Sequence, residues 1–399
     1  MNCFKTREKI KVLVSYRVLQ SWRLPVFIEL DKFKDIELRV LTSYDFPSTK
    51  VINCKNNYKY EFWKILFSLN FFIKREKGNI CIPFSPLFLF EVFKFKPDLI
   101  ITEGLSNLFN NLQCFIYSKI SDIPLLQWGL GDLPINNRSR QMQLIKDIFG
   151  KYESLSTGAL AYSTHSANYY QQVGLQKSAV SVIYNSVNID KRKDEILNYF
   201  KINQLEDIVH INKSENIVYL GALEKNKRVD ILLIFFSEIL KVRPQTNLLI
   251  IGDGNEKTNL IEYVKSNSIP NVTFIGNVSN NICRYLCISK VLVLPSLGGL
   301  VFTEALVHGI PVICGPADGS ERDLLIHQSD FILNESMSIK NLSCWVNFTL
   351  KLLNDEELCK HYTINGFKLL KKLGSYNYAN RIRKHVFKTL KRVEKLHDV

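Results

Sequence analysis

The second half of the chain contains a lone carboxylate shortly after a pair of glycines. The segment LPSLGGLVFTEALVHGIPVI (294–313) predicts a strand, a glycine turn and a helix that begins at Leu300. Glu304 lies in the first turns of this helix, where an unpaired buried carboxylate is costly but two ribose hydroxyls would satisfy both oxygens. Gly298 and Gly299 leave the amides at the helix start unobstructed, which suits phosphates attached to the same ribose.

Two cations stand at a second turn of the same kind. Lys227 and Arg228 follow the predicted strand NIVYLG (216–221) and open the next predicted helix, whose first amides favour an anion. The pair fits a diphosphate, although a solvated basic helix end has the same pattern. Further along, IIGDGNEK (250–257) places Gly254 in a tight turn that a ligand can approach closely. This segment lacks the third glycine of G-x-G-x-x-G and the acid that should follow, which disfavours NAD.

The elements that must position these residues alternate along the chain. Short β-branched runs are separated by longer helical patterns, which predicts parallel sheets of βαβ units and an α/β fold. In the first half the predicted strands are 11–16, 36–43, 98–104, 123–129, 158–164 and 180–185. In the second half they are 216–221, 247–254, 272–276, 290–296, 310–316 and 330–334. Because ligands bind at the carboxyl ends of parallel strands, each strand-to-helix turn of the second half is a candidate contact.

Length and pattern together predict two Rossmann-like lobes that face each other across a cleft. The chain has 399 residues, of which 46% are hydrophobic, and this is more than one core usually holds. The predicted parts are an N-terminal lobe (1–190), a polar inter-domain connection (191–215), a C-terminal lobe (216–370) and a C-terminal helix (371–399) that can return to the N-terminal lobe.

Composition argues against several classes of protein. Charged residues interrupt the first dozen positions, so we expect no signal peptide and predict a cytoplasmic location. Apolar stretches such as 291–303 stop short of the roughly 20 residues that a membrane-spanning helix needs. The nine cysteines form no C-x-x-C pair and the seven histidines form no H-x-x-x-H cluster, so no metal site is predicted.

The net charge of +14 admits nucleic acid, an anionic membrane surface or a phosphorylated ligand as the partner. The sequence lacks a basic stripe interleaved with aromatics, so we expect no nucleic acid. The segment FWKILFSLNFFIKREKG (62–78) joins large aromatic side chains to Lys74, Arg75 and Lys77, as an interfacial membrane helix does. This pattern predicts a peripheral protein on an anionic membrane, at the inner face of the cytoplasmic membrane. The alternative for 62–78 is a core helix with a solvated end.

Six segments of the chain resemble a known family. They are SWRLPVFIEL (21–30), VSVIYNSVNID (180–190), YLGALEKNKRVDILL (219–233), LLIIGDGNEKTNL (248–260), VTFIGNV (272–278) and the glycine-turn helix (294–313). The family is that of the retaining nucleotide-sugar glycosyltransferases with two Rossmann-like lobes, the GT-B fold, also called glycosyltransferase group 1 or family 4. The first segment is similar to members from bacterial surface-polysaccharide clusters. The resemblance implies an enzyme that moves a sugar from a nucleotide-diphosphate sugar to a glycan acceptor.

This resemblance implies roles for individual residues. Glu304 matches the glutamate that grips the donor ribose. Lys227 matches the lysine that contacts the donor diphosphate and stabilises the departing nucleotide, so these two residues are expected to carry the catalysis. The other residues implied in donor binding are Gly221, Arg228, Gly252, Gly254, Gly276, Asn277, Ser296, Gly298, Gly299, Leu300 and Val301.

The sequence departs from the family pattern at three places. Ala222 stands where many members have a phosphate-binding arginine, Ser296 stands where they have a first glutamate, and no histidine follows the strand at 123–129. The resemblance implies front-face substitution with retention of anomeric configuration, without a metal or another cofactor. The candidates for the acceptor side are Arg17, Trp22, Arg23, Glu103, Trp128 and Asp132, each of which has the alternative of being a core or a surface residue.

The resemblance also implies a lipid-linked saccharide acceptor, in the synthesis of O-antigen, capsule, lipopolysaccharide or a similar bacterial polysaccharide. Two other classes stay open. A nucleotide-sugar epimerase of similar two-lobed fold would use the same phosphate and ribose contacts, but it needs acid/base groups that QWGLGD (127–132) does not obviously supply. A non-enzymatic protein that binds nucleic acid or another anion would explain the positive charge.

Overall fold

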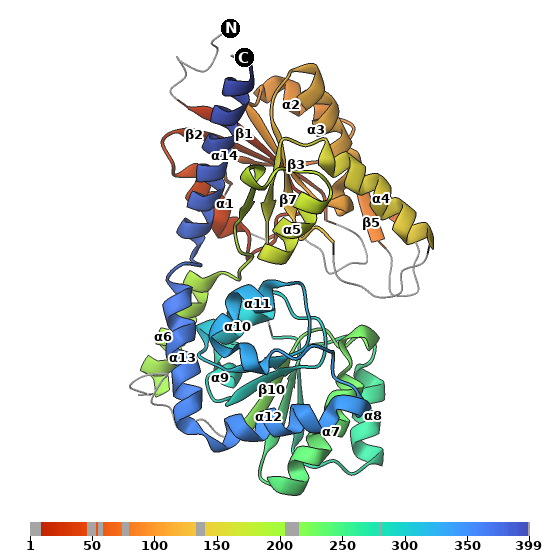
Figure 1. Cartoon of the computed structure of the whole chain (residues 1–399), viewed down its shortest axis with the longest axis vertical. Helices are drawn as coiled ribbons and strands as arrows, with labels where there is room; N and C mark the ends of the chain where they lie inside the picture. Colours follow the sequence, from red (N-terminus) through yellow and green to blue (C-terminus); the bar gives the residue numbers. More distant parts are fainter. Residues whose placement is uncertain are drawn as a thin grey trace. The chain divides into compact units, whose positions relative to one another are not determined.

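The computed structural model divides into two compact units, each with a parallel sheet (Figure 1). It describes residues 9–45, 53–54, 59–73, 80–132, 140–203, 215–278 and 281–397. Unit 1 comprises Met1–Tyr184 and Ser375–Val399, and unit 2 comprises Asn185–Gly374. The first boundary therefore falls after Tyr184, slightly earlier than the predicted end of the N-terminal lobe at 190.

The main sheet of unit 1 has seven parallel strands. In spatial order they are β3 (Trp63–Leu66), β2 (Ile36–Ser43), β1 (Ile10–Ser15), β6 (Leu99–Glu103), β7 (Leu125–Gly129), β8 (Gly158–Ala161) and β9 (Val180–Val182). The central strands are buried on both faces, which explains why their sequences are continuous apolar runs. All six strands predicted for this half of the chain are confirmed.

Helices cover both faces of this sheet. Val12 and Val14 of β1 pack in one core with α1 (Leu24–Asp31) and α14 (Ser375–His397), whereas Leu13 faces the opposite core with α2 (Phe88–Phe95) and α3 (Leu108–Ile120). The alternation follows from the two-residue period of a strand. The remaining α-helices described in unit 1 are α4 (Arg140–Ser154) and α5 (Thr164–Gln172).

The C-terminal helix α14 belongs to unit 1 although it follows the whole of unit 2 in the sequence (Figure 1). It packs against α1, and its Tyr378, Ile382 and Val386 are fully buried in the core that contains β1. The guanidinium of Arg383 also pairs with Asp35. The same face of the helix thus buries apolar side chains at the spacing of an amphipathic helix.

The prediction of an interfacial helix at 62–78 is wrong. Trp63–Leu66 form β3, and Leu69–Ile73 form β4, which pairs antiparallel with β5 (Ile80–Phe84). Aromatic and β-branched side chains favour the pleated strand, and pairing of β3 with β2 satisfies its backbone. The indole of Trp63 donates to Thr42 on β2 at 2.9 Å. Lys74, Arg75 and Lys77 lie outside the described residues.

Unit 2 is built on a five-stranded parallel sheet. Its spatial order is β12 (Val272–Gly276), β11 (Asn247–Ile251), β10 (Asn216–Leu220), β13 (Val291–Leu294) and β14 (Val312–Cys314). Five of the six strands predicted for this half are confirmed. The sixth, at 330–334, is wrong: Ile326–Phe331 form a 3-10 helix, and a single bridge joins Ile332 to Cys314.

The helices of unit 2 follow its strands. They are α6 (Ile189–Asn203), α7 (Val229–Val242), α8 (Lys257–Ser266), α9 (Cys283–Leu286), α10 (Leu300–Val307), α11 (Ser320–Leu324), α12 (Leu342–Asn354) and α13 (Glu356–Leu370). The predicted polar connection at 191–215, in which we expected some helix, begins with α6, which packs on α10 within unit 2. Residues 204–214 lie outside the described residues.

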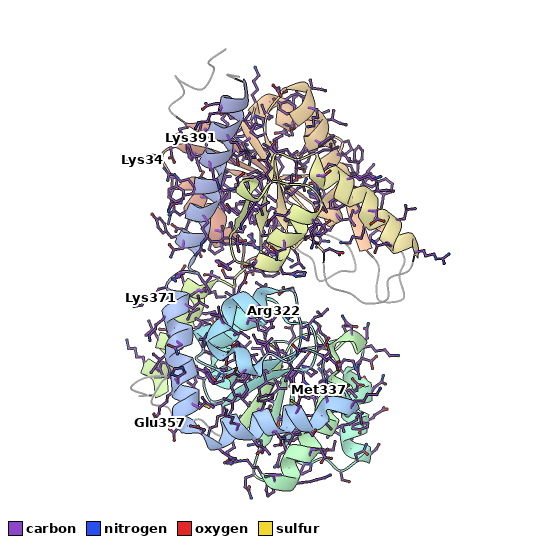
Figure 2. All side chains as sticks on the ribbon, in the orientation of Figure 1. Lys34, Arg322, Met337, Glu357, Lys371 and Lys391 are labelled. Carbon is purple, nitrogen blue, oxygen red and sulfur yellow. The ribbon has the colours of Figure 1, made fainter. Side chains whose placement is uncertain are left out.

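The charges on α13 suit its dipole, as Figure 2 shows with Glu357 and Lys371 at its two ends. Acidic side chains in the first turn and basic ones in the last turn face the partial charges of a helix. Across the described ranges, no helix is long and apolar enough to cross a membrane.

Candidate functional site

The glycine turn ahead of α10 needs glycine at both positions. Gly299 has φ +128°, and a Cβ there would lie 3.3 Å from the Oδ2 atom of Asp318. A Cβ on Gly298 would lie 2.4 Å from the ring of Phe302. The first amides of a helix have no intrahelical acceptor, so the turn presents the N–H groups of Leu300 and Val301 at a positive helix end.

Lys227 reaches this turn from another loop. It ends the 3-10 turn before α7, and its ammonium donates to the carbonyl oxygen of Leu297 at 2.6 Å. Burial lowers the pKa of Lys227, and the nearby carboxylate of Asp318 partly opposes that shift. Turns that follow β10, β13 and β14 therefore meet around one cation, one carboxylate and one helix N-terminus.

Arg228, the other predicted diphosphate cation, has a different setting. It caps α7 in the left-handed conformation with φ 55°. Its guanidinium lies 3.7 Å from Asp230, an exposed pair. Such surface pairs contribute little, and the structure does not join Arg228 to the contacts of Lys227.

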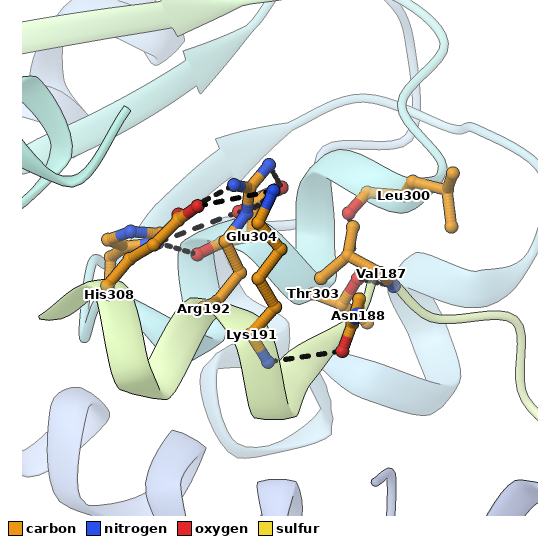
Figure 3. A network of polar contacts seen from close by, with 9 residues as sticks. Val187, Asn188, Lys191, Arg192, Leu300, Thr303, Glu304 and His308 are labelled. Carbon is orange, nitrogen blue, oxygen red and sulfur yellow. Dashed lines mark hydrogen bonds and ion pairs between the residues drawn. The ribbon is translucent and has the colours of Figure 1, made fainter. Parts of the chain in front are cut away.

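Glu304 lies inside unit 2 and is already paired (Figure 3). Only 6% of it is exposed, and Arg192 of α6 donates from Nε to both carboxylate oxygens at 2.9 and 3.0 Å. Burial raises the pKa of Glu304, and the Arg192 guanidinium opposes that shift. A protein cation therefore already neutralises the carboxylate for which the sequence suggested ligand hydroxyls.

A second contact fixes α10 against the start of α6 (Figure 3). The N–H of Val187 donates to Thr303 Oγ1 at 3.1 Å, and that hydroxyl donates to the Leu300 carbonyl at 2.8 Å. His308, at the end of α10, lies with its Nδ1 3.8 Å from Glu304 Oε2 and 2.8 Å from the Glu304 carbonyl oxygen. The position of Glu304 is thus set by groups on two helices.

The loops that follow β10, β11 and β12 lie against one another. A Cβ on Gly252 (φ +148°) would lie 1.8 Å from the Gly221 carbonyl oxygen, and one on Gly254 would lie 2.4 Å from that of Leu223. The Gly252 N–H donates to Gly276 at 2.8 Å. Close backbone approach therefore requires glycine at these positions. Asn277, which follows in the next loop, is exposed.

Most residues predicted for donor binding thus follow the carboxyl ends of the unit 2 strands, as the sequence suggested. Ser296 lies directly after β13 and is 9% exposed. Two neighbours of the site were not singled out from the sequence. Arg192 stands in a helical run of mixed charges, and Asp318 stands in a DGS turn, and neither pattern signals a contact more than 15 residues away.

The candidates for the acceptor side fall into two groups. Arg23 and Trp128 are buried, with the guanidinium 5.1 Å from the indole centroid and 4.9 Å from that of Tyr378. Arg23 Nε also donates to Tyr16 at 3.3 Å. Cation–π stacking holds this charge within the core, so the structure favours the core alternative for Arg23 and Trp128.

The other acceptor-side candidates lie nearer to solvent. The Arg17 N–H donates to Glu103 at 2.7 Å, and burial raises the pKa of that carboxyl. Asp132 pairs with Lys146 at 3.1 Å beside a hollow of about 380 Å³ between α4 and α5. Trp22 is half-buried.

Among the described residues, no group of three or more His, Cys, Asp or Glu side chains could hold a metal ion. The groups that the structure shows at the unit 2 site are an ammonium, a helix N-terminus and a buried carboxylate, a set suited to a phosphorylated ligand with hydroxyls.

The fold is that of two α/β units of the GT-B class, each built on a parallel sheet. Residues 201–369 match the family model described as Glycosyl transferases group 1. The match covers less than half of the chain, and over that part it agrees with the resemblance found in the sequence.

Curated relatives match parts of the chain. An "Uncharacterized 41.2 kDa protein in cps region" of Klebsiella pneumoniae is 25% identical over 51% of this chain and 55% of its own length. The N-acetyl-alpha-D-glucosaminyl L-malate synthase of Bacillus anthracis is 30% identical over 45% of each chain. The amylovoran biosynthesis glycosyltransferase AmsD of Erwinia amylovora is 25% identical over 63% of this chain and 73% of its own. The first two matches thus span about half the length of the relatives.

Solved structures share the fold over nearly the whole chain. Anabaena Alr3699/HepE, in complex with UDP and glucose, has a TM-score of 0.64 at 16% identity over 94% of this chain and 99% of its own. The UDP-GlcNAc 2-epimerase from Neisseria meningitidis, bound to UDP-GlcNAc, has a TM-score of 0.58 at 16% identity over 95% and 100%. The chain thus shares its fold with a protein solved with UDP and glucose and with an epimerase solved with UDP-GlcNAc.

Proposed function

We propose that this protein transfers a sugar from a nucleotide-diphosphate sugar to a glycan acceptor in bacterial surface-polysaccharide synthesis, as in O-antigen, capsule or lipopolysaccharide. The observation that carries the proposal is the contact of Lys227 with the glycine turn at the start of α10, the helix that also carries Glu304, within the part of the chain that matches the group 1 model. The names of two relatives support the setting, since one lies in a cps region and another acts in amylovoran biosynthesis.

The donor would lie along the carboxyl edge of the unit 2 sheet. The Lys227 ammonium and the amides of Leu300 and Val301 would neutralise its diphosphate, and Glu304 would accept hydrogen bonds from its ribose. The base would lie by Gly276 and Asn277. These groups are held before ligand binds, and preorganised charges stabilise a developing anion without further rearrangement.

The proposed reaction is a front-face substitution that keeps the anomeric configuration. The acceptor oxygen bonds to the anomeric carbon on the face from which the diphosphate leaves, and the hydroxyl proton passes to the departing phosphate. Lys227 and the α10 N-terminus stabilise the charge that develops there, so the step requires no metal.

The test is nucleotide release and sugar transfer by the purified protein. A panel of nucleotide-diphosphate sugars is incubated with and without a lipid-linked saccharide, in EDTA and in Mg²⁺, and the product anomer is read by NMR. We expect acceptor-dependent release that EDTA does not reduce, and a retained anomer. An epimeric nucleotide sugar formed without acceptor would instead assign the chain to the epimerase class, whose fold it shares.

We further propose that unit 1 meets an anionic membrane that carries the lipid-linked acceptor. The supporting surface, the outer apolar face, consists of large exposed side chains on α2 and α3: Leu87, Phe90, Phe93, Leu112, Ile116 and Ile120. They recur at three- and four-residue spacing, so each helix turns one apolar stripe outward. The two helices pack together.

Positive charge accompanies this face. Lys94 and Lys96 at the end of α2 and Lys119 at the end of α3 are exposed. Each cation near an anionic surface adds about 1 kcal/mol, and apolar side chains add area to be buried. Single exposed apolar side chains are normal on a protein surface, whereas a contiguous apolar patch marks an interaction site. The positive charge of the neighbouring lysines complements anionic lipid.

Vesicle sedimentation tests the outer apolar face. The wild type should sediment with phosphatidylglycerol vesicles at low salt, less so at high salt, and weakly with pure phosphatidylcholine. The double change Phe90→Ser with Ile116→Ser should reduce binding several-fold. A matched control changes two exposed side chains of unit 2, Ile326→Ser and Ile339→Ser. Failure of the wild type to sediment with anionic vesicles would overturn the membrane proposal. So would a wild-type dimer that Phe90→Ser with Ile116→Ser abolishes and the control pair does not, because the face would then be a contact between two copies of the chain.

A further inference from the structure

The carboxylate of Glu304 meets the edge of a single guanidinium (Figure 3). Nε of Arg192 donates to Oε1 and Oε2 at 2.9 and 3.0 Å, and Nη2 lies 2.8 Å from Oε1. A carboxylate has roughly four lone-pair directions. Arg192 presents two N–H groups from one side, and both of them reach Oε1, so the carboxylate keeps acceptor capacity for further hydrogen bonds chiefly at Oε2.

Arg192 is itself held from two directions. Its Nη1 donates to Glu195 on the same helix at 2.7 Å, and Glu195 also lies 3.6 Å from Lys191. The backbone just before α6 is tied to α10 through the bond from Val187 N–H to Thr303 Oγ1. A planar guanidinium between two carboxylates has little freedom to turn. Glu304 therefore meets a fixed partner.

We propose that Arg192 is a positioning residue for donor binding: its guanidinium fixes the orientation in which the Glu304 carboxylate accepts hydrogen bonds from the two ribose hydroxyls. The inference rests on the proposed function, since the ribose belongs to the nucleotide-diphosphate donor. The inference adds Arg192, a residue of the segment 191–215 that was expected to connect the two lobes, to the donor site.

The charges around Glu304 give the proposal a pH signature. The described groups that face it are Arg192, Lys191 and Glu195 on α6 and His308 on α10. Burial raises the pKa of Glu304, and Arg192 opposes this. Without Arg192 the pKa of Glu304 should rise further. On acidification the carboxylate then takes up its proton at a higher pH than in the wild type. Donor affinity should then fall over a higher pH range than in the wild type.

The experiment measures KM and kcat for the nucleotide sugar between pH 5.5 and 8.5. Arg192→Met should raise the donor KM roughly ten- to a hundredfold, the scale of a charge-assisted contact, with a much smaller change in kcat. Its KM profile should shift toward higher pH. Arg192→Lys should recover part of the affinity, because a point charge replaces the fork.

A double-mutant cycle separates positioning from simple support of the fold. If Arg192 acts through Glu304, then Arg192→Met combined with Glu304→Gln should bind donor no more weakly than Glu304→Gln alone. The matched control is Arg243→Met, which breaks the ion pair between Arg243 and Glu215. Glu215 directly precedes β10, so this pair lies at the amino ends of the strands of the same sheet. This variant should lower thermal stability without the KM effect or the pH shift.

The outcomes also separate this inference from the proposed function. A wild type that binds no nucleotide-diphosphate sugar would overturn both. A wild type that binds donor, with Arg192→Met and Arg192→Lys binding equally well at every pH, would overturn the positioning role alone. Effects that add fully in the double variant, or that Arg243→Met reproduces, would also refute it.

Discussion

Replacing Lys227 with alanine tests the charge at the centre of the donor site. Its ammonium donates to Leu297 at 2.6 Å, beside the glycine turn of α10. Removing it takes away one charge-assisted hydrogen bond, worth roughly 1.5–3 kcal/mol, to the leaving diphosphate. By transition-state arithmetic that loss lowers turnover about ten- to 150-fold. Burial already lowers the pKa of Lys227, so its charge is less solvated than that of a surface lysine and the larger end of the range is expected.

The assay is steady-state nucleotide release with acceptor, read as kcat and donor KM separately. Lys227→Ala should lower kcat more than it raises KM, because charge on the leaving group develops in the transition state. Lys225→Ala is the matched control, an exposed lysine in the same 3-10 turn. Equal kcat in Lys227→Ala and the control would refute the assigned role. A drop that appears in KM alone would refute leaving-group stabilisation.

Two further changes have distinct readouts. Gly299→Ala should strain a backbone at φ +128° and place a Cβ 3.3 Å from Asp318, so donor affinity should fall by about tenfold or more while the melting temperature drops slightly; nucleotide titration calorimetry showing wild-type affinity would contradict this. Glu153 is 2% exposed and accepts from Tyr169 at 2.5 Å, and burial raises its pKa from 4.5 to about 7. The folded state then holds this proton more tightly than the unfolded one, so its contribution, about 3 kcal/mol by linkage, is full below pH 4.5 and is lost as pH rises through 7. Melting curves of wild type and Glu153→Gln from pH 4 to 8 should converge toward low pH as the neutral carboxyl and amide become alike, and parallel curves would refute it.

Local pattern was enough for the elements that hold the site. The strands at β10 to β14 and the helix from Leu300 were predicted because apolar periodicity and glycine punctuation are properties of adjacent residues. Gly298 and Gly299 were recognised for the same reason, since a turn between a strand and a helix is written in consecutive residues. The positions of Lys227 and Glu304 followed from the rule that loops after parallel strands share one edge.

Short apolar runs were where sequence alone failed. The residues at 63–73 have the composition of either a helix or a strand, and only pairing of β3 with β2 and of β4 with β5 made them strands. The run at 330–334 has the composition of a strand, but it pairs with β14 only through the isolated bridge between Ile332 and Cys314. Strands depend on pairing partners that lie far away in the sequence. The local sequence of a short apolar run therefore does not determine whether it forms a strand or a helix.

Contacts between distant residues were decided by the tertiary structure alone. Glu304 meets Arg192 across 112 positions, and no local signal in either segment points to the other. Arg23 was a candidate ligand contact because of its place in a strand-to-helix turn, yet it is buried and stacks on Trp128 and Tyr378. The sequence by itself determined which residue types stand at the ends of the strands. Folding determined which of them pair with one another, because burial and ion pairing depend on where every other element packs.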